Sequence, residues 1–444
     1  MNQTFMKEKP IKRLVLSMAL PMVISMMVNS LYNIVDSYFV AKVNEQAMTA
    51  LSLVYPIQNL ITSIAVGFSI AVNAMIAFYM GAGNQEKADK VATDGIVFNV
   101  LHGVILLIGC YIGMPTFLRF FTSDEVVIRY GIIYSEIAFS FSVVITVGIA
   151  FEKIFQSVGR MKVSMISMMA GCIMNIILDP IFIFGLGRIP AMGMRGAALA
   201  TGIGQVITLI VYLYFYFKRP LPVTISFRHW KVDWQILKKL YGIGLPATLN
   251  MALPSLLIAA LNVILSAYGG IYVLVLGVYY KLQTFLYLPA NGIIQGIRPL
   301  IGYNYGAKEY KRVRKIYQFA LVLIVGIMLL GTGICELLPG KLIGLFTINE
   351  ETIQAGVTAL RIICLGFVVS SVSVTFSGTL EGLGKGTPSF FISLLRYVVV
   401  IIPTAYLLSR WLGAIGVWLA FVVAEWLTAV FSYSLFRRCH KFVE

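Results

Sequence analysis

Four polar side chains in the first half of the sequence lie inside long, mainly apolar stretches and could form one site: Asp36, Asn175, Asp179 and Thr201. Together they supply two carboxylates, an amide and a hydroxyl, and hard oxygen ligands of this kind can coordinate Na⁺. The same two carboxylates could instead hold a proton, because two buried carboxylates in one site do not both stay ionised. These residue types therefore predict a cation site for Na⁺ or H⁺.

Each of these residues also has a simpler interpretation. Asp36 and Asp179 could be interfacial groups in contact with water, and Asp179 followed by Pro180 could be an ordinary helix end. Asn175 and Thr201 could hydrogen bond between helices without any ligand. Inserting an ionisable group at the centre of a bilayer costs roughly 2.5–3.5 kcal/mol, so carboxylates well within a span favour the cation-site hypothesis.

Composition defines the class of protein. Hydrophobic residues make up 59% of the 444 residues, charged residues only 12%, and the mean hydropathy is +0.86. A soluble domain carries about 25% charge, so the sequence predicts a polytopic protein embedded in a lipid bilayer. The net charge of +16 comes from basic residues in short loops. Because no basic run is interleaved with exposed aromatic residues, we expect no nucleic-acid partner.

Twelve apolar runs are long enough to cross a hydrocarbon core of about 30 Å as helices. With the N-terminus inside, the inner loops and ends hold 24 Lys and Arg, and the outer loops hold seven. The positive-inside rule then places both termini in the cytoplasm, and we expect a multi-pass protein of the inner (cytoplasmic) cell membrane. The expected helices cover residues 14–40, 51–80, 91–113, 130–155, 163–187, 193–217, 237–267, 272–297, 315–338, 353–379, 387–409 and 412–436.

The two halves of the sequence resemble each other. An even number of helices per copy gives both copies the same orientation, so they are parallel repeats about an axis along the membrane normal. We therefore expect two six-helix bundles, residues 1–217 and 237–444, joined by a cytoplasmic linker loop at 218–236, and this layout suits alternating access. The matching pairs are Pro21 with Pro246, GNQE (83–86) with GAKE (306–309), Gly159 with Gly384, and GMRGAALA (193–200) with GAIGVWLA (413–420), at offsets of 225, 223, 225 and 220.

The basic residues of the inner loops also indicate how deep in the membrane the polar residues lie. Asp36 lies 23 residues after Arg13, and Asp179 lies 17 residues after Lys162. Thr201 is near the outer end of a helix that runs inward. All three therefore lie in the outer half of the membrane, where they could form one site.

The second half carries different polar groups. Its equivalent of Asp36 is Leu261, so cation coupling should belong mainly to the first half. The helix at 272–297 has a polar and aromatic stripe that could line a substrate path or hydrogen bond to neighbouring helices. Asn33 shares a helix face with Asp36 and extends this candidate path. The stripe consists of Tyr279, Tyr280, Gln283, Tyr287, Asn291 and Gln295.

Over its whole length the chain resembles the MATE (multidrug and toxic compound extrusion) family. The resemblance rests on a first helix with an ALP motif and a late Asp36, on N-x-x-x-D-P at 175–180, and on G-x-x-G-A-A-x-A-T at 193–201. It implies a V-shaped pair of lobes and cation-coupled antiport, in which Na⁺ or H⁺ enters as drug-like compounds leave.

The resemblance also assigns roles. It implies an N-lobe cation site made of the four residues above, and a first helix that bends near Pro21 as the site fills. Some members carry further acidic residues in the seventh and tenth helices. This chain has none at 237–267 and reads VVSSVSVTFSG at 368–378, so a second cation site is not expected.

The leading hypothesis is a secondary antiporter that exports amphipathic, cationic small organic compounds. It needs no cofactor other than the coupling ion and no obligate protein partner. A flippase for lipid-linked saccharides is the alternative, which cationic residues such as Lys281, Arg361 and Arg396 would favour. The chain has no nucleotide-binding P-loop, no histidine–acid pair of an enzyme and no filter-like segment of a channel.

Overall fold

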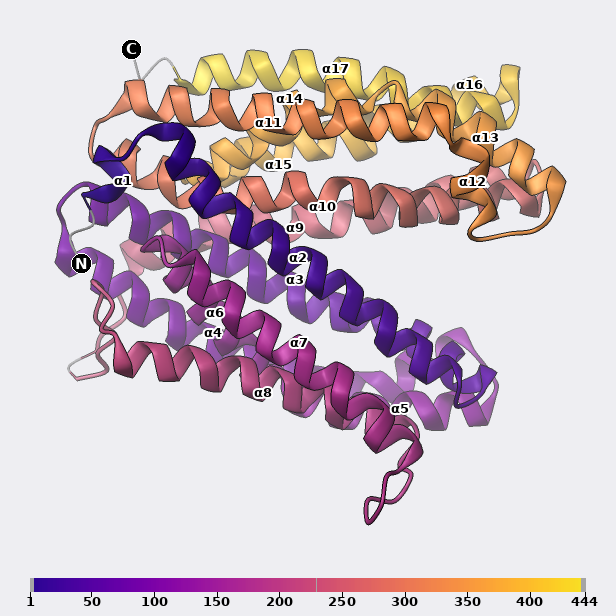
Figure 1. Cartoon of the computed structure of the whole chain (residues 1–444), viewed down its shortest axis with the longest axis horizontal. Coiled ribbons are helices and arrows are strands. Elements are labelled where there is room, and N and C mark those ends of the chain that lie inside the picture. Colours follow the sequence, from indigo (N-terminus) through magenta and orange to yellow (C-terminus); the bar gives the residue numbers. More distant parts are fainter. Residues whose placement is uncertain (1–3, 229, 441–444) are drawn as a thin grey trace. The chain divides into compact units, whose positions relative to one another are not determined.

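The computed structural model describes residues 4–228 and 230–440, and helices account for almost all of them (Figure 1). Within these residues the only strand-like pairing is a single bridge between Leu186 and Ile189. The expected fold class, an all-α integral membrane protein, is confirmed. The first half contains α1 (Phe5–Glu8), α2 (Ile11–Ala41), α3 (Glu45–Gly81), α4 (Gln85–Phe121), α5 (Glu125–Ser140), α6 (Ser142–Ser157), α7 (Met161–Phe184) and α8 (Met194–Lys218).

The second half continues the same design. Among the described residues, ten helices are long and apolar enough to cross a membrane, and twelve spans result when each of two bent pairs counts as one. This agrees with the twelve expected spans. The helices are α9 (Trp234–Ser266), α10 (Gly270–Gly306), α11 (Tyr310–Leu337), α12 (Pro339–Gly344), α13 (Glu350–Cys364), α14 (Phe367–Gly382), α15 (Gly386–Leu394), the π-helix η1 (Leu395–Ile401), α16 (Ile402–Leu412) and α17 (Ala414–His440).

Two of the expected spans are broken in the middle. α5 and α6 meet at 47° around Phe141, and α13 and α14 meet at 53° around Gly366. At the first break, Ser142 Oγ donates to the carbonyl oxygen of Phe139 at 2.6 Å, and such serine contacts accompany helix bends. Phe141 and Gly366 are 225 residues apart. The bend therefore occupies the same place in both repeats.

The turn after α3 corrects one part of the predicted repeat. Gly83 has a left-handed φ of 72° there, and in the turn after α10 the left-handed residue is Lys308, with φ of 60°. In both turns the next main-chain N–H donates to the carbonyl five residues earlier, at 2.9 and 2.8 Å. The expected match of Gly83 with Gly306 was wrong by two residues. The left-handed residue of the second repeat is a lysine and not a glycine. Pairing Gly83 with the nearby Gly306 therefore shifted the alignment of the two repeats by two residues.

The chain forms two compact units. Unit 1 consists of Ile24–Thr248, and unit 2 consists of Thr4–Val23 together with the chain from Leu249 onward. The start of α2 thus belongs to unit 2, and the start of α9 belongs to unit 1. The division falls inside two helices, whereas the sequence predicted bundles at 1–217 and 237–444.

Glycines explain where these helix starts pack. A Cβ on Gly67 of α3 would lie 2.7 Å from the Cα of Thr248 on α9. A Cβ on Gly292 of α10 would lie 2.7 Å from the Cα of Val23 on α2. In both contacts the helix backbones touch with no side chain between them, as small residues allow in membranes. The two contacts are related by the 225-residue offset in both partners.

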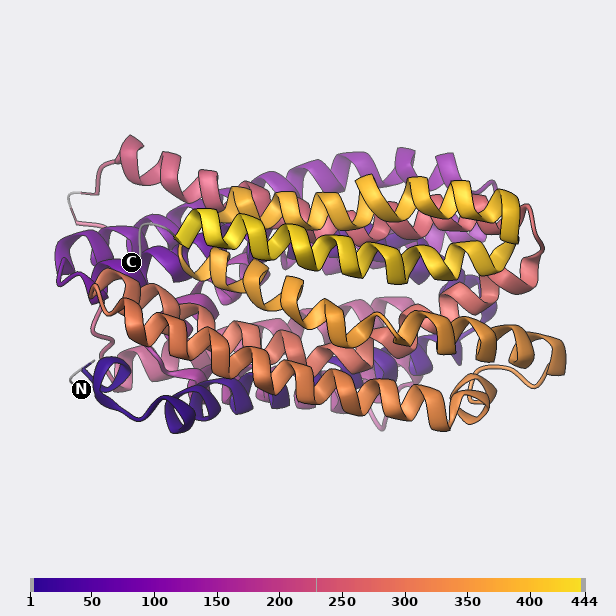
Figure 2. The same ribbon diagram turned by 90° about the horizontal axis from the view of Figure 1, so that it is seen from above.

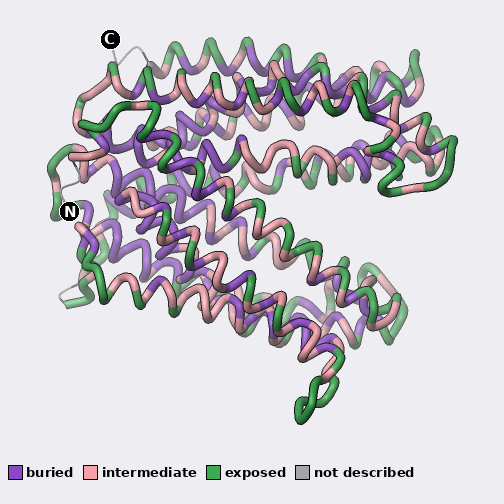
Figure 3. Tube along the Cα trace, viewed as in Figure 1, coloured by how far each residue is buried: buried purple, intermediate pink, exposed green. Residues whose placement is uncertain are grey.

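Each unit is a layered helix bundle. In unit 1, α3 packs against α4, α5 and α6, while α7 packs along α8. In unit 2, α10, α11, α14 and α17 contact one another in turn and run side by side (Figures 1 and 2). Of the most apolar 18 residues of α3, 78% are buried, whereas α11 exposes large apolar side chains such as Leu330. Figure 3 shows exposed positions recurring along the helices. Exposed apolar faces of this kind suit contact with lipid.

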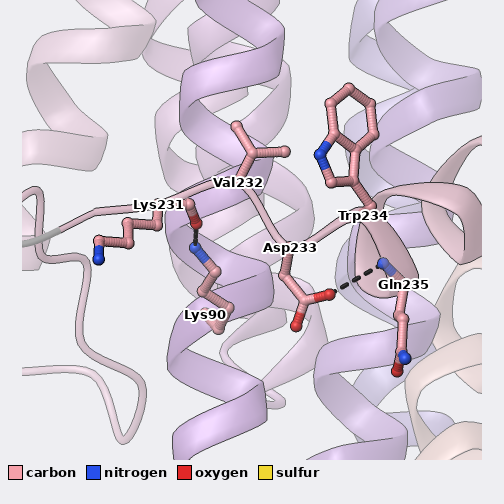
Figure 4. Close-up of a pocket in the computed structure, with 6 residues that line it drawn as sticks. All are labelled: Lys90, Lys231, Val232, Asp233, Trp234 and Gln235. Atoms are coloured by element: carbon pink, nitrogen blue, oxygen red, sulfur yellow. Dashed lines mark hydrogen bonds between the residues drawn. The ribbon is translucent and has the colours of Figure 1, made fainter.

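The expected linker loop, 218–236, runs along α4 in unit 1. Trp230 Nε1 donates to Asp94 Oδ1 at 2.7 Å, and Lys90 of the same helix points at the main chain of the loop (Figure 4). His229, within this stretch, lies outside the described residues. The loop is therefore attached to unit 1 by side chains that the sequence did not single out.

The left-handed turn yields a stability prediction. Gly83→Ala should lower the free energy of unfolding by about 1 kcal/mol, because a Cβ disfavours positive φ even though no atom lies within 4 Å of it. The control is Gly109→Ala in α4, which also has open space and should gain about 0.5–1 kcal/mol from helix propensity. Thermal unfolding in detergent measures both variants. Equal stability of the two would contradict the left-handed assignment.

Candidate functional site

Glycine contacts bring α7 and α8 together. A Cβ on Gly171 would lie 2.6 Å from the carbonyl oxygen of Gly204, and a Cβ on Gly204 would lie 3.3 Å from the Cβ of Asn175. Because the two helix backbones touch, short polar side chains one turn away can contact each other across the two helices. This contact sets Asn175 of α7 beside Thr201 of α8.

Asn175 links α7 to α8. Its amide donates to Asp179, one helical turn later, and in the orientation that satisfies both amide atoms Nδ2 lies 3.1 Å from Asp179 Oδ2. Its Oδ1 then accepts from the main-chain N–H of Thr201 at 3.1 Å. In the opposite orientation, Nδ2 lies 3.4 Å from both Asp179 Oδ1 and Thr201 Oγ1. Asn175 therefore holds the Asp179 carboxyl group in place in either orientation.

The carboxyl groups of Asp36 on α2 and Asp179 on α7 lie within hydrogen-bonding reach of each other. Asp179 is fully buried and Asp36 is 9% exposed. The second oxygen of Asp36, Oδ1, is buried and has no hydrogen-bond partner among the described residues. Two carboxyl groups can approach in this way only when a proton or a cation lies between them. The donor set is therefore chemically suited to a proton or to Na⁺.

The structure thus brings together all four of the predicted residues within unit 1: Asp36, Asn175, Asp179 and Thr201. The simpler alternative, two unconnected interfacial carboxylates, does not match this burial. Whether a cation binds there stays a prediction.

Sequence reasoning missed three neighbours of the site. Gln58 on α3 donates from Nε2 to the hydroxyl of Tyr134 on α5 at 3.1 Å, and the Tyr134 hydroxyl lies close to Thr201. Tyr32 on α2 lies close to both Asp36 and Asp179. Tyr32 could have been found, since it precedes Asp36 by one helical turn. Gln58 and Tyr134 had no such signal, because only tertiary packing joins α3 and α5 to α8.

The predicted substrate-path residues separate into different environments. Asn33 is exposed, and its amide donates to Asn29 Oδ1 at 2.9 Å. On α10, Tyr279 is buried against Phe421, and the Tyr287 hydroxyl lies 2.7 Å from Ser370 Oγ, so these tyrosines bind neighbouring helices. The half-buried or exposed members, whose role stays a prediction, are Tyr280, Gln283, Asn291 and Gln295.

Pro21 lies inside α2, two residues before the point where the helix passes from unit 2 to unit 1. A proline inside a helix donates no main-chain hydrogen bond and so weakens the helix locally. Pro246 stands at the equivalent place in α9. It lies two residues before Thr248, where that helix passes from unit 1 to unit 2. The position suits the predicted bend in α2, which itself stays a prediction.

The equivalent positions in unit 2 are mostly apolar. At the 225-residue offset, Leu261, Val400 and Thr404 stand where unit 1 has Asp36, Asn175 and Asp179. The tenth helix differs from expectation, because α14 continues to Gly382 and so includes Glu381. Unit 2 therefore has a buried acid of its own, but at another place.

Comparison with known proteins identifies the family. The MatE family model matches residues 21–181 and 246–407, once in each half. Multidrug export protein MepA of Staphylococcus aureus (strain bovine RF122 / ET3-1) is 24% identical over 437 residues, covering 96% of this chain and 93% of MepA. A multidrug resistance MATE family transporter of the MOP superfamily, solved in an outward-facing conformation, is 25% identical with a TM-score of 0.94, covering 100% of this chain and 99% of that chain. A MATE solved in the bent conformation is 25% identical with a TM-score of 0.93, covering 100% and 98%.

A helical bundle of this length with these relatives is a multi-pass membrane transporter of small molecules and not an enzyme. The chain belongs to the MatE family of transporters, whose members include multidrug exporters. The resemblance to MATE transporters inferred from the sequence is confirmed.

Tyr134 provides a test of the site's architecture. Tyr134→Phe should lower the free energy of unfolding by about 1–3 kcal/mol, because Gln58 loses its buried hydrogen-bond acceptor. The control is Tyr111→Phe on the exposed face of α4, where the side chain is 62% exposed and the change should stay within about 0.5 kcal/mol. Thermal unfolding of both purified variants measures the difference. A Tyr134→Phe protein as stable as the control would contradict the hydrogen-bond network.

Proposed function

We propose that this protein is a secondary active antiporter that exports amphipathic, cationic small organic compounds in exchange for Na⁺ or H⁺ by alternating access. The observation that carries the proposal is the pair of buried carboxyl groups, Asp36 and Asp179, that lie within hydrogen-bonding reach of each other inside unit 1. The relatives named as multidrug exporters support drug-like substrates. No obligate protein partner and no cofactor other than the coupling ion are required.

The coupling follows from charge repulsion. When a proton or Na⁺ occupies the site, it neutralises one of the two negative charges of Asp36 and Asp179 and holds the two carboxyl groups together. When the ion leaves, two carboxylates face each other in a poorly solvated place, and their repulsion favours separation. Asp179 is fixed on α7 through Asn175. The side that can move is therefore Asp36 on α2.

Pro21 supplies a place for that movement. α2 runs from unit 2 into unit 1 directly after Pro21, and the missing hydrogen bond lowers the cost of bending there. Occupation of the cation site would then change the course of α2, which links ion binding to a change in the substrate path. One solved relative is described in a bent conformation, which supports this step.

The proposed orientation places both termini in the cytoplasm of a cell whose inner membrane holds the protein. The excess of Lys and Arg in the inner loops supports it. The cation site then lies toward the outer solution, from which the driving ion comes. Outward export of a cationic compound is thereby coupled to inward movement of the ion.

The flippase alternative loses support in unit 2. Arg396 is paired with Glu425, and Arg361 lies 3.9 Å from Glu336. Lys281 lies over the ring of Phe346, 5.7 Å from its centroid. Two of the three cationic residues are therefore neutralised by carboxylates, which leaves less charge to bind a lipid-linked saccharide.

The decisive test is ion-driven efflux by Asp36→Asn. In proteoliposomes loaded with ethidium, with Na⁺ and pH gradients imposed separately, wild-type protein should release ethidium under one gradient. Asp36→Asn should reduce this to the rate of vesicles without protein, because the amide can neither take up a proton nor provide the anionic ligand. Identification of the effective gradient also identifies the coupling ion.

Asp124→Asn is the matched control. Asp124 caps the start of α5 by accepting from the N–H of Val126 at 2.8 Å, and asparagine caps helices about equally well. This variant should transport like wild type. Undiminished efflux by a well-folded Asp36→Asn protein would remove the carboxyl pair from the mechanism and with it the proposed coupling.

The asymmetry between units has its own test. Leu261 is fully buried, so Leu261→Asn should cost about 1–3 kcal/mol of stability through an unpaired amide. The ion dependence of the remaining ethidium efflux should stay that of wild type. A loss of gradient-driven efflux as complete as in Asp36→Asn, in protein that is still folded at the assay temperature, would show that unit 2 also couples the ion.

A further inference from the structure

Unit 2 contains a polar cavity of about 170 Å³. This volume far exceeds the roughly 10–15 Å³ that a single water needs. Residues of α9, α10, α14, α15 and η1 form its wall. The charged side chains in that wall are Arg298, Glu381 and Arg396, accompanied by Asn250, Asn291 and Tyr397.

The π-helical segment η1 places Arg396 at the cavity. Pro403, just after this segment, has no N–H to donate to the preceding turn, and the wider π-helical turn accommodates the loss. Segments of this kind are rare and occur frequently at functional sites. Arg396 is only 7% exposed, so its charge is held inside the unit.

The one carboxylate in the cavity wall is already engaged. Glu381 forms an ion pair with Arg298. Its Oε1 also accepts from Ser389 Oγ at 3.1 Å and from Asn250 Nδ2 at 3.5 Å. Glu381 therefore has little capacity to bind a cation from the cavity.

The two arginines, in contrast, have donors to spare. Arg396 pairs with Glu425 of α17, which is not part of the cavity wall. The Nε atoms of both Arg298 and Arg396 are buried and have no acceptor among the described residues. Arginine cannot lose its proton in a protein, so each buried N–H needs an oxygen acceptor to avoid a penalty.

We propose that this cavity binds the carboxylate or phosphate group of an anionic ligand, with Arg298 and Arg396 as its charged donors. Each arginine is already paired with a glutamate, so the cavity offers an anion the two buried Nε–H donors that have no acceptor among the described residues. Planar guanidinium donors match carboxylate and phosphate oxygens. The site thus offers hydrogen-bond donors, whereas the pair in unit 1 offers carboxylate oxygens. That the bound group belongs to an exported compound rests on the proposed function, whereas the binding itself does not.

Isothermal titration of the purified full-length protein tests the proposal. Benzoate and phenyl phosphate are the anionic probes, and benzamide is the uncharged probe of the same shape as benzoate. Titrations run at constant ionic strength and without any ion gradient. We expect saturable binding of an anionic probe with one site per chain, and no saturable binding of benzamide.

Two substitutions with opposite expected effects separate ligand binding from a purely structural role. Arg298→Gln should weaken benzoate binding about tenfold or more, the range expected for a lost charged hydrogen bond. Glu381→Gln should strengthen it, because Arg298 is released from its competing carboxylate. The double variant Arg396→Gln/Glu425→Gln removes the second pair without leaving a buried charge and should also weaken binding.

Glu336→Gln and Arg361→Gln are the matched controls, because this ion pair is exposed, with side-chain exposures of 38% and 57%. Both should bind benzoate like wild type. If phosphatidylglycerol in nanodiscs competes with benzoate and phosphatidylcholine does not, a lipid headgroup is a source of the anion. If neither lipid competes, the anion is a soluble one. The proposal is overturned if neither anionic probe binds saturably, or if Arg298→Gln and Glu381→Gln titrate like wild type. Asp36→Asn should bind benzoate normally, so a failure here is distinct from a failure of ion-coupled efflux.

Discussion

The contact between Asp36 and Asp179 is the interaction on which the architecture of unit 1 depends. Two carboxyl groups this close together and away from water repel each other when both are ionised, so a proton or a cation between them favours their approach. The surrounding structure serves this approach. Glycines on α7 and α8 let the two backbones touch, and Asn175 uses the closeness to hold Asp179. Gln58 and Tyr134 extend the support to α3 and α5.

Duplication provides the scaffold, and substitution within it changes the chemistry. The same 225-residue offset relates the helix bends at Phe141 and Gly366 and the left-handed turns at Gly83 and Lys308. Backbone features are therefore kept in both copies. The polar side chains are not, since Leu261 replaces the carboxylate of Asp36. Unit 2 instead contains two arginine–glutamate ion pairs, so one fold carries a pair of carboxyl groups in one copy and a cavity with arginine donors in the other.

Much of the fold could be predicted because bilayer physics acts on local sequence. A span must satisfy its backbone internally and present apolar side chains, and both requirements are visible in composition and length. The predicted helices at 51–80 and 91–113 were shorter than the real ones, since α3 and α4 continue past the apolar run into polar residues such as Glu45 and Gln85. The bends at Phe141 and Gly366 were not predicted, because neither lies beside a proline inside its helix.

The sequence by itself determined the class of protein, the number of spans, the repeat and the four polar residues of the candidate site, because helix periodicity and hydropathy depend on neighbours along the chain. Only the tertiary structure decided that Asp36 meets Asp179, that Gln58 and Tyr134 join them, and that Arg298 and Arg396 face one cavity. These contacts join helices far apart in sequence, and they depend on how closely glycines let the helices approach. The pattern of residues along the chain does not specify the distance between two packed helices.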